Sequence, residues 1–141
     1  MAEPKRKRPL LIFLLCLVFA GLVFFGWLRF QQSLQNWSLE AALVSAQLPV
    51  YTTISGGLWG LAGLPAIIGL WLRSRWAMAY TLFAVIFYPL TFWIEKIFVK
   101  ISPIRMVNWE FDTGLTMIWL LFAGLALYLP NSRKYIKGWR T

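Results

Sequence analysis

Apolar residues gather in four long runs along the chain, and polar residues are largely confined to the stretches between them. The runs cover about residues 10–28, 51–72, 76–96 and 113–129. A helix needs about 20 mainly apolar residues to cross the hydrocarbon core of a bilayer, and each run is close to that length. The pattern therefore predicts an all-α integral membrane protein, with four transmembrane helices forming an antiparallel bundle in a single domain of residues 1–141.

One helical face of the third run differs from a lipid-facing surface. Its residues are small, hydroxylated or acidic, and they recur every three or four positions: Ala77, Thr81, Ala84, Tyr88, Thr91 and Glu95. Positions three and four apart lie on one side of a helix. Polar groups at membrane depth face protein or water rather than lipid. We therefore expect this face to pack against other helices.

The second run carries glycines on one face. Gly56, Gly60 and Gly63 lie on the same side of a helix. Small residues let a neighbouring backbone approach closely, which is how many transmembrane helices associate. The short link 73–75 leads directly into the third run. The sequence therefore predicts a tight hairpin in which these glycines pack against the polar face of the third run.

The two other connectors are longer. Residues 30–50 place apolar residues on one helical face, which predicts a short amphipathic helix on the outer membrane surface. A helical extension of the first run fits this stretch equally well. Residues 97–112 form a second outer loop, and Asp112 is placed to cap the N-terminus of the fourth run. Pro130 is expected to end that run.

The charge distribution predicts an orientation. The chain has 14 Lys and Arg residues against 5 Asp and Glu, a net charge of +9. Ten of these 14 basic residues lie in the two terminal segments and the 73–75 link, and the other four lie in the opposite connectors. Cytoplasmic segments carry the excess of Lys and Arg in membrane proteins. We therefore expect cytoplasmic termini, an inner face that contacts anionic headgroups, and no nucleic-acid partner.

The composition also limits the chemistry. The chain has no His and one Cys, Cys16. An intramolecular disulfide, a His-ligated haem and a His/Cys zinc or copper site are therefore excluded. The apolar cores of the four runs contain no charged residue, whereas proton and ion pathways usually carry charged residues at membrane depth. We expect no metal or cofactor, and the pattern argues against an ion-coupled transporter.

Polar residues that could form a site gather at the outer ends of the runs. The candidates for an outer-mouth binding site are Tyr88, Thr91, Glu95, Arg105, Glu110 and Asp112. They could line a shallow cavity for a lipid headgroup or small amphiphile, with Glu95 facing Arg105 or another basic group. Alternatively, they simply end and cap helices. Acid–base catalysis would have to use Glu95, Glu110 or Asp112, but no spacing requires it, so no catalytic residue is assigned.

Three segments, YTTISGGLWGLAGLP, GLWLRSRWA and FYPLTFWIEK, resemble a pattern found in small four-span bacterial inner-membrane proteins of unknown function. The resemblance covers most of the hairpin formed by the second and third runs. It implies the bacterial inner (plasma) membrane and no particular activity.

Together these features predict a multi-pass membrane protein that is not an enzyme. A non-catalytic binding, accessory or scaffold subunit fits best, with a membrane-protein partner or a second copy of the chain. The alternative is a transporter or a protein that binds a lipid or small amphiphile at a shallow site on the outer mouth of the bundle.

Overall fold

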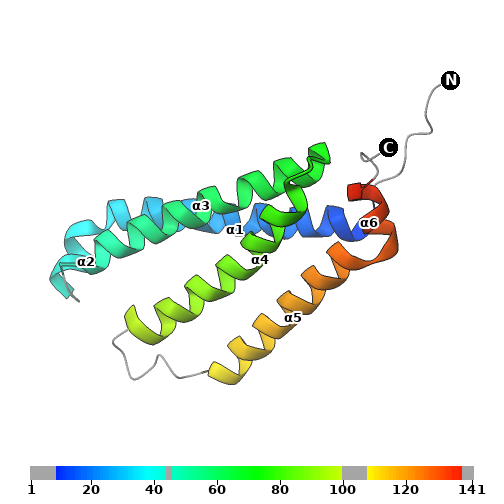
Figure 1. The fold of residues 1–141 in the computed structure, drawn as a ribbon. Coiled ribbons are helices and arrows are strands. Elements are labelled where there is room, and N and C mark those ends of the chain that lie inside the picture. The colour runs from blue at the N-terminus through cyan, green and yellow to red at the C-terminus, as the bar shows by residue number, and fades with distance from the viewer. Residues whose placement is uncertain (1–8, 44–45, 100–107, 138–141) are drawn as a thin grey trace.

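The computed structural model describes residues 9–43, 46–99 and 108–137, and every regular element within these ranges is a helix (Figure 1). The elements are α1 (Leu10–Gln35), α2 (Trp37–Leu43), α3 (Leu48–Leu72), α4 (Ala77–Ile94), the π-helical turn η1 (Glu95–Val99), α5 (Trp109–Tyr128) and α6 (Pro130–Lys137). Four helices are long and apolar enough to cross a membrane: α1, α3, α5, and α4 with its continuation to Phe98. The predictions of an all-α chain and of four candidate spans are confirmed.

The first long helix extends well beyond its predicted end. Helix α1 continues to Gln35, well past residue 28, because 29–35 contains neither Gly nor Pro to stop it. Asn36 then ends α1 by donating its backbone N–H to the Gln32 carbonyl. The separate helix α2 starts one residue later. The connector is thus partly an extension of the first span and partly a short helix of its own.

Helices α1 and α3 form the most closely packed pair in the fold. They run antiparallel, with Gly26 of α1 facing Gly56 and Gly60 of α3. A Cβ atom added to Gly26 would lie 2.3 Å from the backbone nitrogen of Gly60. The glycine face of the second span was expected to pack against the third span, but it packs chiefly against α1. Only where α1 also presents a glycine can the two backbones come this close.

Gly63 is the point where the glycine face meets both neighbours. A Cβ atom there would lie 2.6 Å from Val23 of α1 and 2.8 Å from the Tyr88 hydroxyl of α4. The expected contact with the polar face of α4 is therefore present at this position. Further along α3, Gly69 packs against Ala77 at the start of α4.

A tight turn joins α3 to α4. Arg73 adopts a left-handed conformation (φ 55°) at the end of α3, and the backbone N–H groups of Arg73 and Ser74 both point to the Gly69 carbonyl. Along α4, the predicted polar and small-residue face turns inward: Ala77, Thr81, Ala84, Tyr88 and Glu95 are buried and Thr91 is half-buried. This face packs against protein, as its composition indicated.

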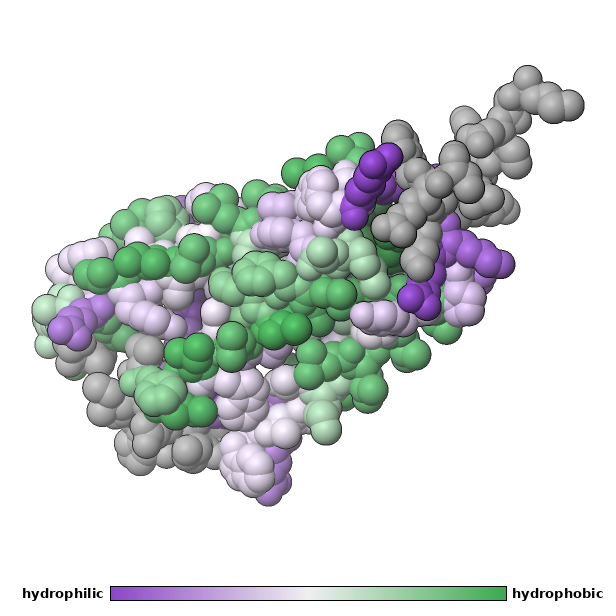
Figure 2. All heavy atoms as spheres, in the orientation of Figure 1, coloured by the Kyte–Doolittle hydropathy of each residue, from purple (hydrophilic) through white to green (hydrophobic). Residues whose placement is uncertain are grey.

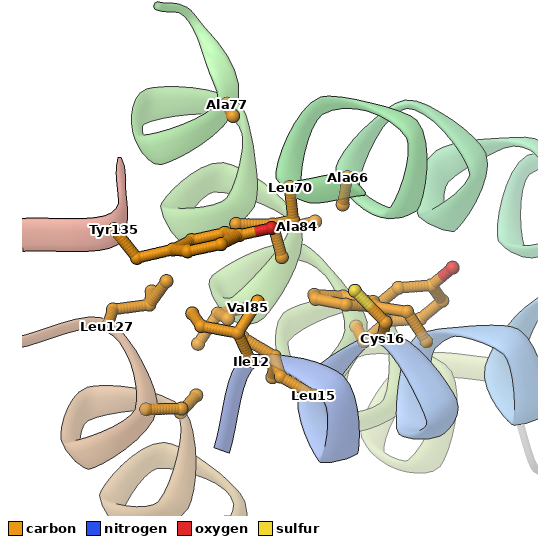
Figure 3. Close-up of a cluster of buried hydrophobic side chains, with 14 residues drawn as sticks. Ile12, Leu15, Cys16, Ala66, Leu70, Ala77, Ala84, Val85, Leu127 and Tyr135 are labelled. Atoms are coloured by element: carbon orange, nitrogen blue, oxygen red, sulfur yellow. The ribbon is translucent and has the colours of Figure 1, made fainter. Parts of the chain in front are cut away.

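The buried apolar core lies where α1, α3, α4, α5 and α6 meet (Figure 3). Leu15 from α1, Leu70 from α3 and Leu127 from α5 are almost completely buried there. Tyr135 of α6 is only 4% exposed, and the Arg73 guanidinium lies 4.1 Å from the centre of its ring. Helix α6 therefore folds back over this end of the molecule.

The surface agrees with a membrane environment. Figure 2 shows hydrophobic residues over the middle of the visible face and hydrophilic residues toward its ends. Large apolar side chains such as Phe24, Ile86 and Leu121 are more than half exposed. A water-soluble protein rarely exposes apolar surface of this extent, so these side chains are suited to contact with lipid.

The close contact at Gly26 can be tested with a matched pair of glycines on α1. Gly26→Ala should destabilise the protein by about 1–3 kcal/mol, because the added methyl group meets α3 backbone that must move. Gly21→Ala is the control, since nothing lies within 4 Å of its added Cβ, and it should leave stability unchanged or raise it by up to about 1 kcal/mol. Thermal unfolding in detergent measures both. Equal unfolding temperatures for the two variants would contradict the packing.

Candidate functional site: an ion-pair clasp beside a lateral groove

Two ion pairs join three helices at the end of α4. The Glu95 carboxylate accepts a hydrogen bond from Arg29 of α1, with 2.7 Å between Nη1 and Oε2. The next residue, Lys96, pairs with Asp112 of α5 through its ammonium group. Successive residues of a helix point in different directions, so one turn of chain reaches both neighbours. We call these four residues, Arg29, Glu95, Lys96 and Asp112, the clasp.

The clasp is largely shielded from solvent. Glu95 is 9% exposed and Lys96 is 6% exposed. A charge removed from water is costly unless it is paired, and each of these two has a partner of opposite charge. Lys96 also lies near the Trp93 ring, with Nζ 5.5 Å from its centre. Glu95 and Lys96 lie in the π-helical turn η1, and such turns occur frequently at functional sites.

Glu95 and Asp112 both lie in ion pairs. Glu95 was expected at the outer mouth, facing Arg105 or another basic group; it is 9% exposed and pairs with Arg29. Asp112 was predicted to cap the fourth span, but α5 begins at Trp109 with Asn108 as its N-cap. Asp112 lies in the first turn of α5, where its carboxylate is held by Lys96.

The other candidate residues do not join the clasp. Arg105 lies outside the described residues, and Glu110 is exposed. Tyr88 and Thr91 both bind Trp59 of α3: the Tyr88 hydroxyl donates to the Trp59 carbonyl (2.7 Å), and the Trp59 indole N–H donates to the Thr91 hydroxyl (2.9 Å). These two residues therefore link α3 to α4.

A second polar cluster, which the sequence pattern did not reveal, joins α1, α2 and α3. The Glu40 carboxylate of α2 accepts hydrogen bonds from Thr52 of α3 (3.0 Å) and Ser33 of α1 (3.4 Å). The Ser33 and Thr52 hydroxyls are themselves 2.5 Å apart. Glu40 therefore joins α2 to α1 and α3 at the turn between the first two long helices. This turn is on the same side of the molecule as the clasp.

A groove opens between α1 and α5 next to the clasp. Its volume is about 280 Å³, and α3 and α4 contribute to its floor. The groove is lined by Val18, Leu22, Trp59, Tyr88, Pro89, Phe92, Asp112, Leu115, Thr116 and Trp119. A shallower hollow lined by Leu14, Leu17, Val18 and Phe122 adjoins it. The two hollows share Val18, so they follow the same seam between α1 and α5.

The uneven packing of α5 explains why the groove exists. The buried residues of α5 are Ala123, Ala126 and Leu127, all near its C-terminal end, where small side chains allow close approach to the core. Near the other end, a Cβ atom added to Gly114 would meet nothing within 4 Å. The helix is therefore anchored in the core at one end and by the clasp at the other. Between them the Trp119 ring packs against the Phe19 ring of α1, with 5.6 Å between their centres, and the groove opens beside this contact.

The polar groups on the groove wall mostly bind one another. The Thr116 hydroxyl donates to the Asp112 carbonyl (2.8 Å) and accepts from the Trp93 indole N–H (3.1 Å). The Trp119 indole N–H donates to the Val85 carbonyl (2.9 Å). What remains is an apolar wall with one charged lining residue, Asp112, at one end.

The described part of the chain contains no group of three or more His, Cys, Asp or Glu residues that could hold a metal ion. No protein-family model, curated protein or solved structure matches this chain.

A double-mutant cycle tests the α1–α4 half of the clasp. Arg29→Gln and Glu95→Gln should each lower the free energy of unfolding by about 1–3 kcal/mol, because each leaves the other charge shielded and unpaired. The double variant should lose less than the sum of the two. Glu110→Gln removes an exposed carboxylate and should change stability by no more than about 0.5 kcal/mol. Strictly additive losses in denaturant titrations would contradict the pairing.

Proposed function

We propose that this protein is a multi-pass membrane protein that works by binding rather than catalysis, and that its groove between α1 and α5 holds the apolar chain of a lipid or small amphiphile. The sequence pattern favours an accessory or scaffold subunit, whereas the geometry of the groove favours the binding of an amphiphile. The observation that carries the proposal is the groove itself, an apolar hollow with a charged residue at one end.

The length of the groove along α5 matches the thickness of one leaflet of a bilayer. On α5, its lining and that of the adjoining hollow run from Asp112 to Phe122, which is about 15 Å at a rise of 1.5 Å per residue. The hydrocarbon core of a bilayer is about 30 Å thick, so this length is about one leaflet. A volume of about 280 Å³ is just below the range of ligand pockets, about 300 to 1,000 Å³, which leaves room for no more than one chain.

The clasp supports a preformed site. Glu95 binds α1 and Lys96 binds α5, the two helices on either side of the groove. The Tyr88 and Thr91 bonds to Trp59 fix α4 on α3 in the floor. A site whose walls are already held in place loses less conformational freedom when it binds, which favours affinity.

The proposed setting is the bacterial inner membrane, with the four long helices crossing as an antiparallel bundle. The ten-to-four division of Lys and Arg supports cytoplasmic termini, and the resemblance of the hairpin segments supports a bacterial plasma membrane. In this orientation the clasp and the Glu40 cluster lie on the outer side, and α2 lies against the outer surface.

A role as an accessory or scaffold subunit is the second candidate. It is favoured by Gly114 and Gly124 of α5, where an added Cβ atom would meet nothing within 4 Å. Small residues are common where transmembrane helices meet, so this exposed helix could receive a helix of a membrane-protein partner or of a second copy. Purification in mild detergent as a monomer, without a co-purifying protein, would argue against this role.

Cysteine labelling tests the orientation. Ser38 and Asn131 are both exposed and lie in α2 and α6, and the native Cys16 is buried. A membrane-impermeant maleimide added to intact cells should label Ser38→Cys and should leave Asn131→Cys unlabelled until the membrane is permeabilised. Labelling of Asn131→Cys from outside would reverse the proposed topology.

Occupation of the groove is tested by filling it. Leu115 lines the groove, whereas Leu121, on the same helix, is 67% exposed and lies outside the lining. In native mass spectrometry of detergent-purified protein, the wild type and Leu121→Trp should retain one lipid or amphiphile. Leu115→Trp should lose at least about 90% of that adduct, a tenfold weakening that corresponds to about 1.4 kcal/mol. Equal retention by all three proteins would contradict the proposed site.

A further inference from the structure

We infer that the molecule held in the groove carries a hydrogen-bond donor at its polar end, an amine or an uncharged hydroxyl group, rather than a phosphate or carboxylate. This inference rests on the proposed function and specifies the chemistry of the ligand. It follows from the polar groups that the groove presents to an incoming molecule.

The position of Asp112 determines where the polar end of the bound molecule lies. This residue is the charged group of the groove lining, and it lies in the first turn of α5, at the end of the groove next to the clasp. Away from this end, the lining of the seam becomes purely apolar, ending at Leu14, Leu17 and Phe122. A chain lying along the seam would therefore place its polar end beside the Asp112 carboxylate.

Of the ion pair between Lys96 and Asp112, an incoming molecule meets Asp112. The Asp112 side chain is 21% exposed, whereas that of Lys96 is 7% exposed. Lys96 binds Oδ2 of Asp112, and among the described residues no hydrogen bond reaches Oδ1. The accessible group is thus a carboxylate oxygen, which accepts hydrogen bonds and cannot donate one while ionised.

The hydrogen-bond donors of the side chains on the described lining are already bonded within the protein. The Tyr88 hydroxyl donates to the Trp59 carbonyl, and the indole N–H groups of Trp59 and Trp119 donate to Thr91 and to Val85. The Thr116 hydroxyl donates to the Asp112 carbonyl. A phosphate needs several donors and would lie next to a negative charge, whereas an amine or hydroxyl group finds an acceptor.

The N-terminus of α5 adds little attraction for a phosphate. The N-terminus of a helix attracts anions, but the first turn of α5 already carries two carboxylates, Glu110 and Asp112. Their negative charges offset the positive end of the helix dipole. Among the described residues, the charges at this end therefore favour a neutral or cationic polar end.

The test compares three amphiphiles with the same saturated chain: hexadecylamine, monopalmitoylglycerol and hexadecyl phosphate. Each is titrated into delipidated, detergent-purified full-length protein, and the one-to-one adduct is followed by native mass spectrometry. The amine and the glyceride should bind at least about tenfold more tightly than the phosphate, as expected for one charge-assisted hydrogen bond. Leu121→Trp, on the same helix but outside the groove lining, should keep this ranking.

A charge exchange provides the matched variant. Lys96→Asp combined with Asp112→Lys keeps an ion pair between α4 and α5 but presents a donor to the groove. The preference should then reverse, with hexadecyl phosphate the tightest ligand. The wild-type ranking needs no variant, so it decides the question even if the exchanged protein does not fold.

The outcomes separate this inference from the function on which it rests. Equal binding of the three amphiphiles, or tightest binding of the phosphate by the wild type, would overturn the inference and leave the groove as a chain-binding site. Absence of binding for all three amphiphiles would overturn both. Tighter binding of the amine and glyceride, reversed in the exchanged variant, would support both.

Discussion

The arrangement around the groove depends on two adjacent charges that cannot be left unpaired. Glu95 and Lys96 are both largely removed from solvent at the end of α4, where an unpaired charge is far more costly than at an exposed surface. Their partners lie on different helices, Arg29 on α1 and Asp112 on α5. Satisfying both charges therefore fixes where the ends of three helices lie relative to one another.

The opposite end of the fold is held by packing rather than by charge. Around the core, Ala123 and Leu127 of α5 lie completely buried with Leu15 of α1, and Tyr135 of α6 covers them. Between this core and the clasp, α5 has few buried side chains, whereas α1 is held along its length by the glycine contacts to α3. Between its two ends α5 is held to α4 by the Thr116 and Trp119 hydrogen bonds, and the groove stays open on the side of α5 that faces α1.

Local patterns predicted most of the helices, but not how they pair. Chain length and hydrophobicity located the four candidate spans, and the spacing of Ala77, Thr81 and Ala84 identified the buried face of α4. The pairing of Gly26 with Gly60 could not be predicted because either neighbour of α3 could have received its glycine face. Likewise, Glu95 had several basic residues within reach, and only the packing of α1 on α3 brings Arg29 to it. The groove depends on such long-range contacts, and no periodicity in the sequence indicates it.

The most direct measurement for the central claim is an experimental structure of the protein in a lipid nanodisc, at a resolution that shows side chains. The account predicts continuous density for one chain between Leu22 of α1 and Leu115 of α5, ending next to Asp112, with both ion pairs of the clasp intact. A structure in which α1 and α5 close against each other along this seam, leaving no space for a chain, would contradict it.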